Sequence, residues 1–277
     1  MSIVNKKYGH AEVHNTPFDV NYAVDHILLP ANPEDVPQIV GWSGPARSGT
    51  TGLLYLMAGH PQVDRVYFQP LKTLLRKGAP DFDLRRGDKL ICMKEVFRGC
   101  CASNGHDPIG MLLRAGVPAN KITWVAIMRE PQQNYASWVK SFKGVELTAY
   151  ESAQAYSVAL FNKYKDLGVN IIPFSYELLA QNEPKVVNIL LKHAGLQPFA
   201  DPHLAFNEEA ITQKMQHGQS KEAGYFESLL QKTRERKRFV YTRNNVILPA
   251  EVTHELLKRC KARFEEFHER SRQELGL

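Results

Sequence analysis

The sequence predicts an α/β protein with a central parallel sheet in a three-layer α/β/α arrangement, and three observations support this prediction. Apolar segments that fit strands alternate with longer segments that fit helices. The strand segments are continuously apolar, as expected for a parallel sheet buried on both faces. The chain has 277 residues, of which 43% are hydrophobic and 23% charged, so a disordered, collagen-like or coiled-coil protein is excluded.

The first half of the chain should supply most of the sheet. Residues 1–37 show no clear pattern, so we expect a peripheral N-terminal segment whose prolines form a loop leading into the first strand. Apolar runs and helical spacing then predict strand 38–43, helix 50–59, a short strand near 64–68, helix 70–77, strand 88–94 and helix 107–115.

The second half should complete the sheet and cover it. The predicted elements are strand 121–128, helices 132–142 and 149–167, strand 169–174 and helices 184–194, 222–233 and 250–270. One face of the last helix should pack on the sheet through Leu257, Cys260, Phe264 and Phe267. We therefore expect one domain, with an α/β core over 38–196 and a helical cap over 197–277.

Composition limits the function classes. The net charge is +6, and residues 232–243 carry six basic side chains against one glutamate, which fits a solvated helix face, a nucleic-acid patch or part of an anionic cofactor pocket. No run of about 18 apolar residues and no apolar leader occur, so we expect no membrane insertion and a cytoplasmic location. The cysteines lack CxxC spacing, and His10 and His14 lack a third ligand, so no metal is expected.

A glycine-bearing turn joins the first strand to the next helix. It reads Gly44-Pro45-Ala46-Arg47-Ser48-Gly49-Thr50-Thr51. In such a unit the backbone N–H groups and the positive end of the helix dipole converge on one point, so a phosphate is expected there. The glycine spacing is that of a Walker A loop, but Thr50 replaces the lysine, which disfavours a kinase.

This turn resembles the 5′-phosphosulfate loop of sulfotransferases that use 3′-phosphoadenosine 5′-phosphosulfate (PAPS), in which Pro is followed by Lys or Arg, Ser, Gly, Thr and Thr. The resemblance implies that the donor's 5′-phosphate is bound by the backbone of Ala46, Arg47, Ser48, Gly49, Thr50 and Thr51. Arg47 would place its guanidinium on an oxygen that gains charge as the bond to sulfur breaks.

Two further motifs extend the resemblance over about residues 38–196. Arg129 follows strand 121–128 and Ser137 lies two helical turns after it, so both can reach one anion. In the family, an arginine and a serine at this spacing bind the 3′-phosphate of the donor. The segment around Tyr176 resembles the family's Tyr-Glu-x-Leu segment, which makes Tyr176 a candidate nucleotide contact.

The chain also departs from the family pattern. Gly52 stands where cytosolic members carry a tryptophan that stacks on adenine. Lys94 matches a lysine at the end of the third strand, but Val96 stands where those members have the catalytic histidine. Gln69 replaces the glutamate base of glycan-type and tyrosine-type members, and an amide has no basicity to offer.

The general base must therefore be a different residue. Glu95 is the first candidate because it ends a strand beside the expected sulfuryl site, where partial burial would raise its pKa toward the working range. His106 in the following loop is the second candidate. A structural role for Glu95, paired with Lys94 or Arg98, is equally consistent with the sequence.

The sequence thus predicts a PAPS-dependent sulfotransferase that transfers a sulfuryl group to a hydroxyl, or less readily an amine, of a small-molecule or biosynthetic-intermediate acceptor. Arg47, Lys94 and either Glu95 or His106 would be catalytic, without a metal. One alternative is a nucleotide- or RNA-binding protein whose basic block contacts nucleic acid, although only Phe239 and Tyr241 offer stacking there. A kinase with a degenerate Walker A loop is another. The sequence specifies neither the acceptor nor the oligomeric state.

Overall fold

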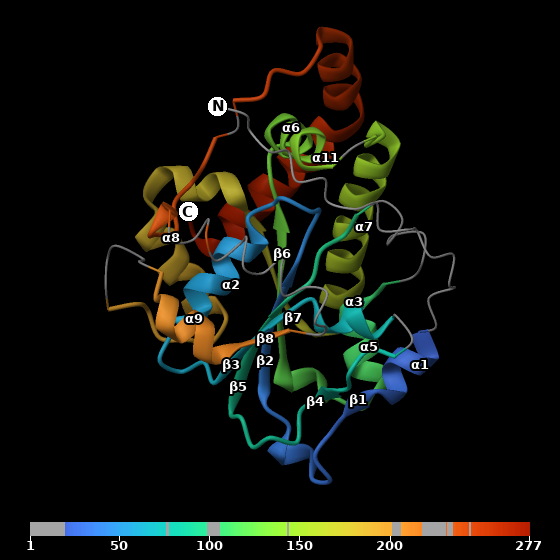
Figure 1. Ribbon diagram of the computed structural model, residues 1–277. Helices are drawn as coiled ribbons and strands as arrows, with labels where there is room; N and C mark the ends of the chain where they lie inside the picture. Colours follow the sequence, from blue (N-terminus) through green and yellow to red (C-terminus); the bar gives the residue numbers. More distant parts are fainter. Residues whose placement is uncertain are drawn as a thin grey trace, which may run out of the picture.

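The structure is a computed structural model that describes residues 20–75, 78–98, 106–142, 144–200, 206–217, 231, 235–243 and 245–277. Its centre is an all-parallel, six-stranded sheet with helices on both faces (Figure 1). The predicted fold class is therefore confirmed. The predicted helix 222–233 lies almost entirely outside the described residues, as do His10 and His14.

The strand order of the sheet is β7-β6-β2-β5-β3-β8. The strands are β2 (Gln38–Ser43), β3 (Arg65–Phe68), β5 (Leu90–Lys94), β6 (Ile122–Met128), β7 (Asn170–Ser175) and β8 (Met215–His217). The chain enters at β2, places β3 and β5 on one side of it, and then places β6 and β7 on the other. In open parallel sheets this change of direction creates a crevice at the carboxyl ends of the central strands, where ligands bind.

Helices cover both faces of the sheet and give the three layers (Figure 1). One face carries α2 (Thr50–Ala58), α8 (Leu179–His193) and α9 (Glu208–Lys214). The other carries α1 (Val20–Asp25), α3 (Pro70–Leu74), α5 (Pro108–Arg114), α6 (Pro131–Ser141), α7 (Leu147–Asp166) and α11 (Ala250–Leu275). Successive residues of β2 point to opposite faces of the sheet. Val40 packs in the core under α2 and α8, and Ile39 packs in the core on the other face.

Two segments differ from the sequence prediction. Ala23 and Ile27 are buried in the core, and β1 (Ile27–Leu28) pairs with β4 (Phe82–Asp83), so the described end of the N-terminal segment is part of the packed domain. Residues 197–277 are not entirely helical, because β8 adds an edge strand beside β3. A three-residue strand directly after a helix is too short for its side chains to show a period of two.

The terminal helix packs against β7, α6 and α7. Its buried face is formed by Leu256, Cys260, Phe264, Phe267, Ser271 and Leu275. The predicted face was therefore wrong at its first position, because Leu256 is fully buried and Leu257 is only half-buried. Among the described helices, none combines the length and the apolarity needed to span a bilayer.

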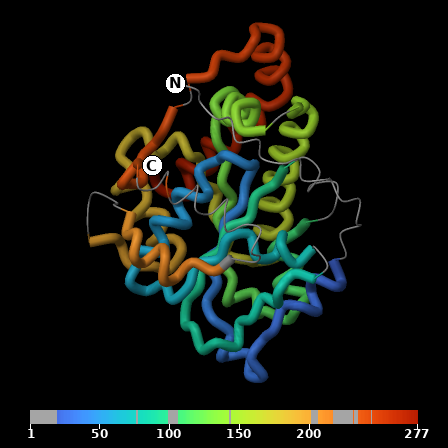
Figure 2. Tube along the Cα trace, viewed as in Figure 1, coloured from blue at the N-terminus to red at the C-terminus, as the bar shows by residue number. Residues whose placement is uncertain are grey.

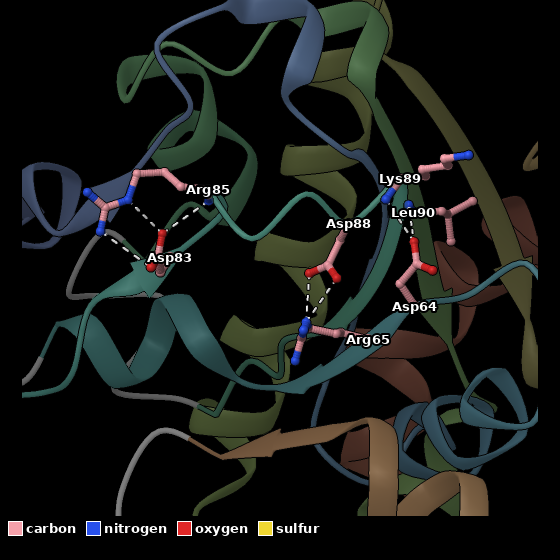
Figure 3. Close-up of polar contacts among 7 residues, drawn as sticks. All are labelled: Asp64, Arg65, Asp83, Arg85, Asp88, Lys89 and Leu90. Atoms are coloured by element: carbon pink, nitrogen blue, oxygen red, sulfur yellow. Dashed lines mark hydrogen bonds and ion pairs between the residues drawn. The ribbon is translucent and has the colours of Figure 1, made fainter.

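Polar contacts fix β3 and β5 at their amino ends, away from the crevice (Figure 3). The Asp64 carboxylate accepts the backbone N–H groups of Lys89 and Leu90 at 2.7 and 3.0 Å. Arg65 Nε donates to both carboxylate oxygens of Asp88 at 2.8 and 2.9 Å. These contacts set the register that brings Phe68 beside Lys94 at the carboxyl ends of the two strands.

Candidate functional site

The turn between β2 and α2 lies at the carboxyl edge of the central strand, and the indoles of all three tryptophans of the chain hold it. Trp42 Nε1 donates to the carbonyl of Thr50 at 2.9 Å, and Trp124 Nε1 donates to Ser43 Oγ at 2.9 Å. Trp138 Nε1 donates to the carbonyl of Ala46. Buried indole N–H groups require such partners, so the packing of three core side chains fixes the shape of the turn.

The continuation of β5 supports the other side of the turn. Phe97 N–H donates to the Gly44 carbonyl, and Ala46 N–H donates to the Phe97 carbonyl, both at 2.9 Å. Ser48 is fully buried, with its hydroxyl donating to the Pro45 carbonyl at 2.7 Å and its N–H to the same oxygen at 3.3 Å. Two of the six amides that we expected on a phosphate, those of Ala46 and Ser48, are thus used inside the protein.

The amino end of α2 keeps its orphan donors. The first hydrogen bond of the helix runs from Leu53 N–H to the Gly49 carbonyl at 3.3 Å, so the N–H groups of Thr50, Thr51 and Gly52 have no acceptor within the helix. Gly49 has a φ of 91°, in the left-handed region that favours glycine. This end of α2 therefore points its donors and its positive dipole into the crevice.

Lys94 adds a buried cation beside these donors. Its side chain is 3% exposed and lies 3.8 Å from the centre of the Phe68 ring. Its Nζ donates to Thr51 Oγ1 at 2.9 Å. Lys94, at the end of β5, and the amino end of α2 therefore lie side by side, as the sequence predicted.

A second group of predicted residues gathers around Arg47, whose φ of 69° places it in the left-handed region. Arg47 Nε donates to Ser137 Oγ at 3.2 Å, and the Arg47 carbonyl accepts Arg129 Nη1 at 3.3 Å. Arg129 is buried, and its Nε has no hydrogen-bond partner within the described part of the chain. Arg129 and Ser137 thus lie on the same side of the turn, linked through Arg47. The Arg47 side chain reaches Ser137.

Residues 239–242 form a wall of this site, and Figure 2 shows the segment in orange-red, leading into α11. They belong to the block 232–243, for which an anionic cofactor pocket was one of the three settings expected from the sequence. The Thr242 carbonyl accepts Arg129 Nη2 at 2.6 Å, and the Tyr241 ring lies 5.3 Å from that of Tyr176. The buried Phe239 ring rests on Gly52, where a Cβ would lie 2.9 Å from its carbons. Phe239 therefore lies beside Gly52, the position at which the sulfotransferases that the turn resembles carry a tryptophan.

Tyr176 connects the turn to this wall. Its ring lies against Gly49, where a Cβ would come within 2.5 Å, and 5.0 Å from the Arg129 guanidinium. Its hydroxyl donates to the Val240 carbonyl at 3.3 Å and accepts Thr242 N–H at 3.3 Å. The side chain thus contacts both predicted anion sites, as a nucleotide contact would.

The two candidate bases form one buried pair. Glu95 Oε2 lies 3.3 Å from His106 Nε2, and both side chains are almost completely buried. Glu95 Oε1 accepts the N–H groups of Leu71 and Lys72 at the start of α3, at 2.9 and 3.4 Å. His106 Nδ1 has no hydrogen-bond partner among the residues that the structure describes. From the sequence, Lys94 or Arg98 was the expected partner of Glu95 in a structural role, but Glu95 contacts His106 and the α3 backbone.

A third cluster links β7 to the terminal helix beside Arg129. Ser175 Oγ donates to Glu177 Oε2 at 3.1 Å and lies 2.8 Å from His268 Nδ1. Burial raises the pKa of Glu177 to about 7, although the nearby backbone N–H of Glu130 and the charge of Arg129 act to lower it. Near neutral pH, Glu177 therefore offsets only part of the positive charge of Arg129.

No protein-family model matches this chain, and no curated protein shows significant sequence similarity to it. The described residues contain no group of three or more His, Cys, Asp or Glu side chains that could hold a metal ion.

The raised pKa of Glu177 predicts a pH-dependent stability. A carboxyl whose pKa rises from 4.5 to about 7 on folding is protonated in both states at low pH, and its ionisation opposes folding as pH rises. Glu177→Gln should therefore be similar to the wild type near pH 4 and more stable at pH 8, on the order of 3 kcal/mol. Urea unfolding at several pH values measures this difference. Glu265→Gln, at an exposed position of α11, is the control, and parallel pH profiles for wild type and Glu177→Gln would contradict the prediction.

Proposed function

We propose that this protein is a sulfotransferase that uses PAPS and transfers its sulfuryl group to a hydroxyl, or less readily an amine, of a small acceptor. The observation that supports this most strongly is the presence of two separate anion sites on one turn. One combines the amino end of α2 with Lys94, and the other combines Arg129 with Ser137 and Arg47. A donor with phosphate groups on the 5′ and 3′ positions of one ribose needs this pair of sites.

The unused hydrogen-bonding capacity of the site fits such a donor. The N–H groups of Thr50, Thr51 and Gly52 would hold the 5′-phosphate, since they have no acceptor within α2. Arg129 Nε, which is buried without a described partner, and the Ser137 hydroxyl would hold the 3′-phosphate. Tyr176 would provide apolar surface between them, since its ring lies against Gly49 and 5.0 Å from the Arg129 guanidinium.

The reaction is an in-line displacement at sulfur. The acceptor oxygen forms a bond to sulfur, the bond from sulfur to the 5′-phosphate oxygen breaks, and the acceptor proton passes to a base. Lys94 stands where negative charge accumulates on the departing phosphate oxygen, with Thr51 and the α2 donors beside it. Because Arg47 points toward Ser137, we assign Lys94 the main electrostatic role and Arg47 a role in binding the 3′-phosphate.

We assign the base to His106, with Glu95 as its positioning residue. One oxygen of Glu95 accepts the α3 backbone N–H groups, and the other lies 3.3 Å from His106 Nε2 with no hydrogen-bond partner in the described part of the chain, so the carboxylate sits between the α3 backbone and the imidazole. Glu95 would orient the imidazole and stabilise its protonated form, leaving Nδ1 for the acceptor hydroxyl. Gln69, which holds a left-handed conformation at the start of α3, lies at the neighbouring strand end and contributes no basicity.

The nucleic-acid alternative has less support. The described basic residues of the block, Arg236, Lys237, Arg238 and Arg243, are exposed. Phe239 is buried against Gly52, and Tyr241 is half-buried beside Tyr176. Neither ring therefore presents an open face on which a base of a single strand could stack.

Titration calorimetry separates the candidate functions. We expect adenosine 3′,5′-bisphosphate to bind more tightly than 5′-AMP, ATP or a short oligonucleotide. Arg129→Ala and Ser137→Ala should reduce the preference for the bisphosphate over 5′-AMP, Arg129→Ala by roughly ten- to a hundredfold, as expected for loss of a charge-assisted contact. Arg114→Ala on α5 is the matched control. Tighter binding of ATP or of the oligonucleotide would instead favour a kinase or a nucleic-acid-binding protein.

Lys94→Met should act on the transfer step. Because the lysine charge is needed most in the transition state, we expect the turnover number to fall by roughly a hundredfold or more, with a smaller loss of bisphosphate affinity. Turnover with radiolabelled PAPS and calorimetry with the bisphosphate measure the two effects. Lys89→Met, at the exposed amino end of the same strand, should retain activity. An equal loss in both measurements would assign Lys94 to binding alone.

The base is tested through the pH–rate profile with an aliphatic alcohol as acceptor. His106→Gln should lower turnover by roughly a hundred- to ten-thousandfold and remove the acidic limb of the profile. Glu95→Gln keeps the shape of the side chain but removes its charge, so it should lower turnover less and move the acidic limb to lower pH, because the imidazolium loses its carboxylate partner. If neither variant changes the profile, the pair is structural and the base is another residue.

A further inference from the structure

Arg98 lies beside the turn between β2 and α2, on the extended continuation of β5. The parallel pairing of β2 with β5 continues past the strand ends, since Glu95 N–H donates to the Trp42 carbonyl at 2.8 Å and Phe97 pairs with Pro45. Arg98 is the next residue after Phe97, and it is exposed to solvent. It is three residue steps from Glu95, or roughly 10 Å along an extended chain.

The Arg98 side chain is oriented without being neutralised. Its guanidinium stacks on the Phe142 ring, 4.0 Å from the ring centre, and the side chain is exposed. In the described part of the chain it makes no ion pair, whereas the exposed Arg85 and Arg259 pair with carboxylates. Stacking holds one face of the guanidinium and leaves its N–H edges available, which is the geometry that binds an oxyanion in two places.

The surroundings of Arg98 are basic. Lys72 Nζ donates to the carbonyl of Val96 at 3.4 Å, and Lys140 is exposed on the last turn of α6, just before Phe142. The sequence stretch that follows Arg98, GCCASNG over 99–105, contains no acidic residue, and the first acid after Phe142 is Glu146, at the start of α7. The nearest acid along the chain, Glu95, is already engaged by His106 and the α3 backbone.

We propose that the acceptor carries a carboxylate or another oxyanion, and that Arg98 binds it. This inference rests on the proposed function. The two phosphate groups of the donor already have their own partners in Lys94, α2, Arg129 and Ser137, whereas Arg98 extends β5 beyond the Glu95–His106 pair that would receive the acceptor proton. The acceptor class is thus a hydroxy compound in which the reacting hydroxyl and the anionic group are separated by several bonds.

The test compares acids with their neutral counterparts. The probes are 4-hydroxyphenylacetate with its methyl ester, and 6-hydroxyhexanoate with 1,6-hexanediol. Transfer from PAPS gives kcat and KM, and calorimetry on the protein saturated with adenosine 3′,5′-bisphosphate gives acceptor affinity independently of turnover. We expect the acids to be preferred over their neutral counterparts by roughly tenfold or more, mainly through a lower KM or Kd. A charge-assisted hydrogen bond to Arg98 would account for a difference of this size.

The variants assign this preference to Arg98. Arg98→Gln should reduce the ratio of acid to neutral probe to about 1, and Arg98→Lys should retain only part of it, since an ammonium lacks the planar fork. Phe142→Leu should lower the preference for the acids, because it removes the ring on which the Arg98 guanidinium stacks. Arg86→Gln, an exposed arginine at the other end of β5, is the control and should retain the full preference.

Three outcomes would overturn parts of the account separately. Equal handling of acids and neutral probes by the wild type, in both transfer and binding, overturns the inference and leaves the donor site intact. Weaker bisphosphate binding in Arg98→Gln overturns it by assigning Arg98 to the donor. Failure of the wild type to bind the bisphosphate contradicts the proposed function itself.

Discussion

The shape of the turn between β2 and α2 is the constraint on which the rest of the site depends. Three indole N–H groups, from β2, β6 and α6, donate to residues 43–50, and the continuation of β5 pairs with residues 44–46. These bonds draw on core side chains from both sides of the central strand, so the turn cannot relax without disturbing the packing of the sheet. They also stabilise Arg47 in its left-handed conformation, which directs its carbonyl toward Arg129 and its side chain toward Ser137.

Electrostatics in the crevice follow from that shape. Lys94 and Arg129 are buried cations: Lys94 donates to the Thr51 hydroxyl, and Arg129 donates to the carbonyls of Arg47 and Thr242. The carboxyl beside Arg129, Glu177, has a pKa raised to about 7 by burial, so it offsets only part of the positive charge at neutral pH and little of it in mildly acidic solution. Buried charges are costly unless they are compensated, and an anionic ligand with two phosphate groups would compensate both. This is the physical basis of the proposed donor.

Most of the fold was predictable because its local signals agree with its packing. The strand 38–43 and the helix that starts at Thr50 follow from an apolar run that ends in glycine, and Pro131 starts α6 as its sequence position indicates. The anion-site residues were found because their spacing along a strand–turn–helix unit fixes their placement. The Glu95–His106 pair, the Phe239 ring on Gly52 and the Thr242 contact to Arg129 join residues that no local pattern relates. Likewise, Leu256 and not Leu257 is buried in α11, because the buried face of a helix depends on the elements that pack against it as well as on its own sequence.

If one turn carries two anion sites with separate roles, a crystal structure of the protein with adenosine 3′,5′-bisphosphate will show both of them occupied. We expect the 5′-phosphate at the amino end of α2 beside Lys94, and the 3′-phosphate on Arg129 and Ser137, with the Thr242 carbonyl displaced from Arg129. A bisphosphate bound elsewhere, or bound with its 3′-phosphate in solvent away from Arg129 and Ser137, would contradict this expectation.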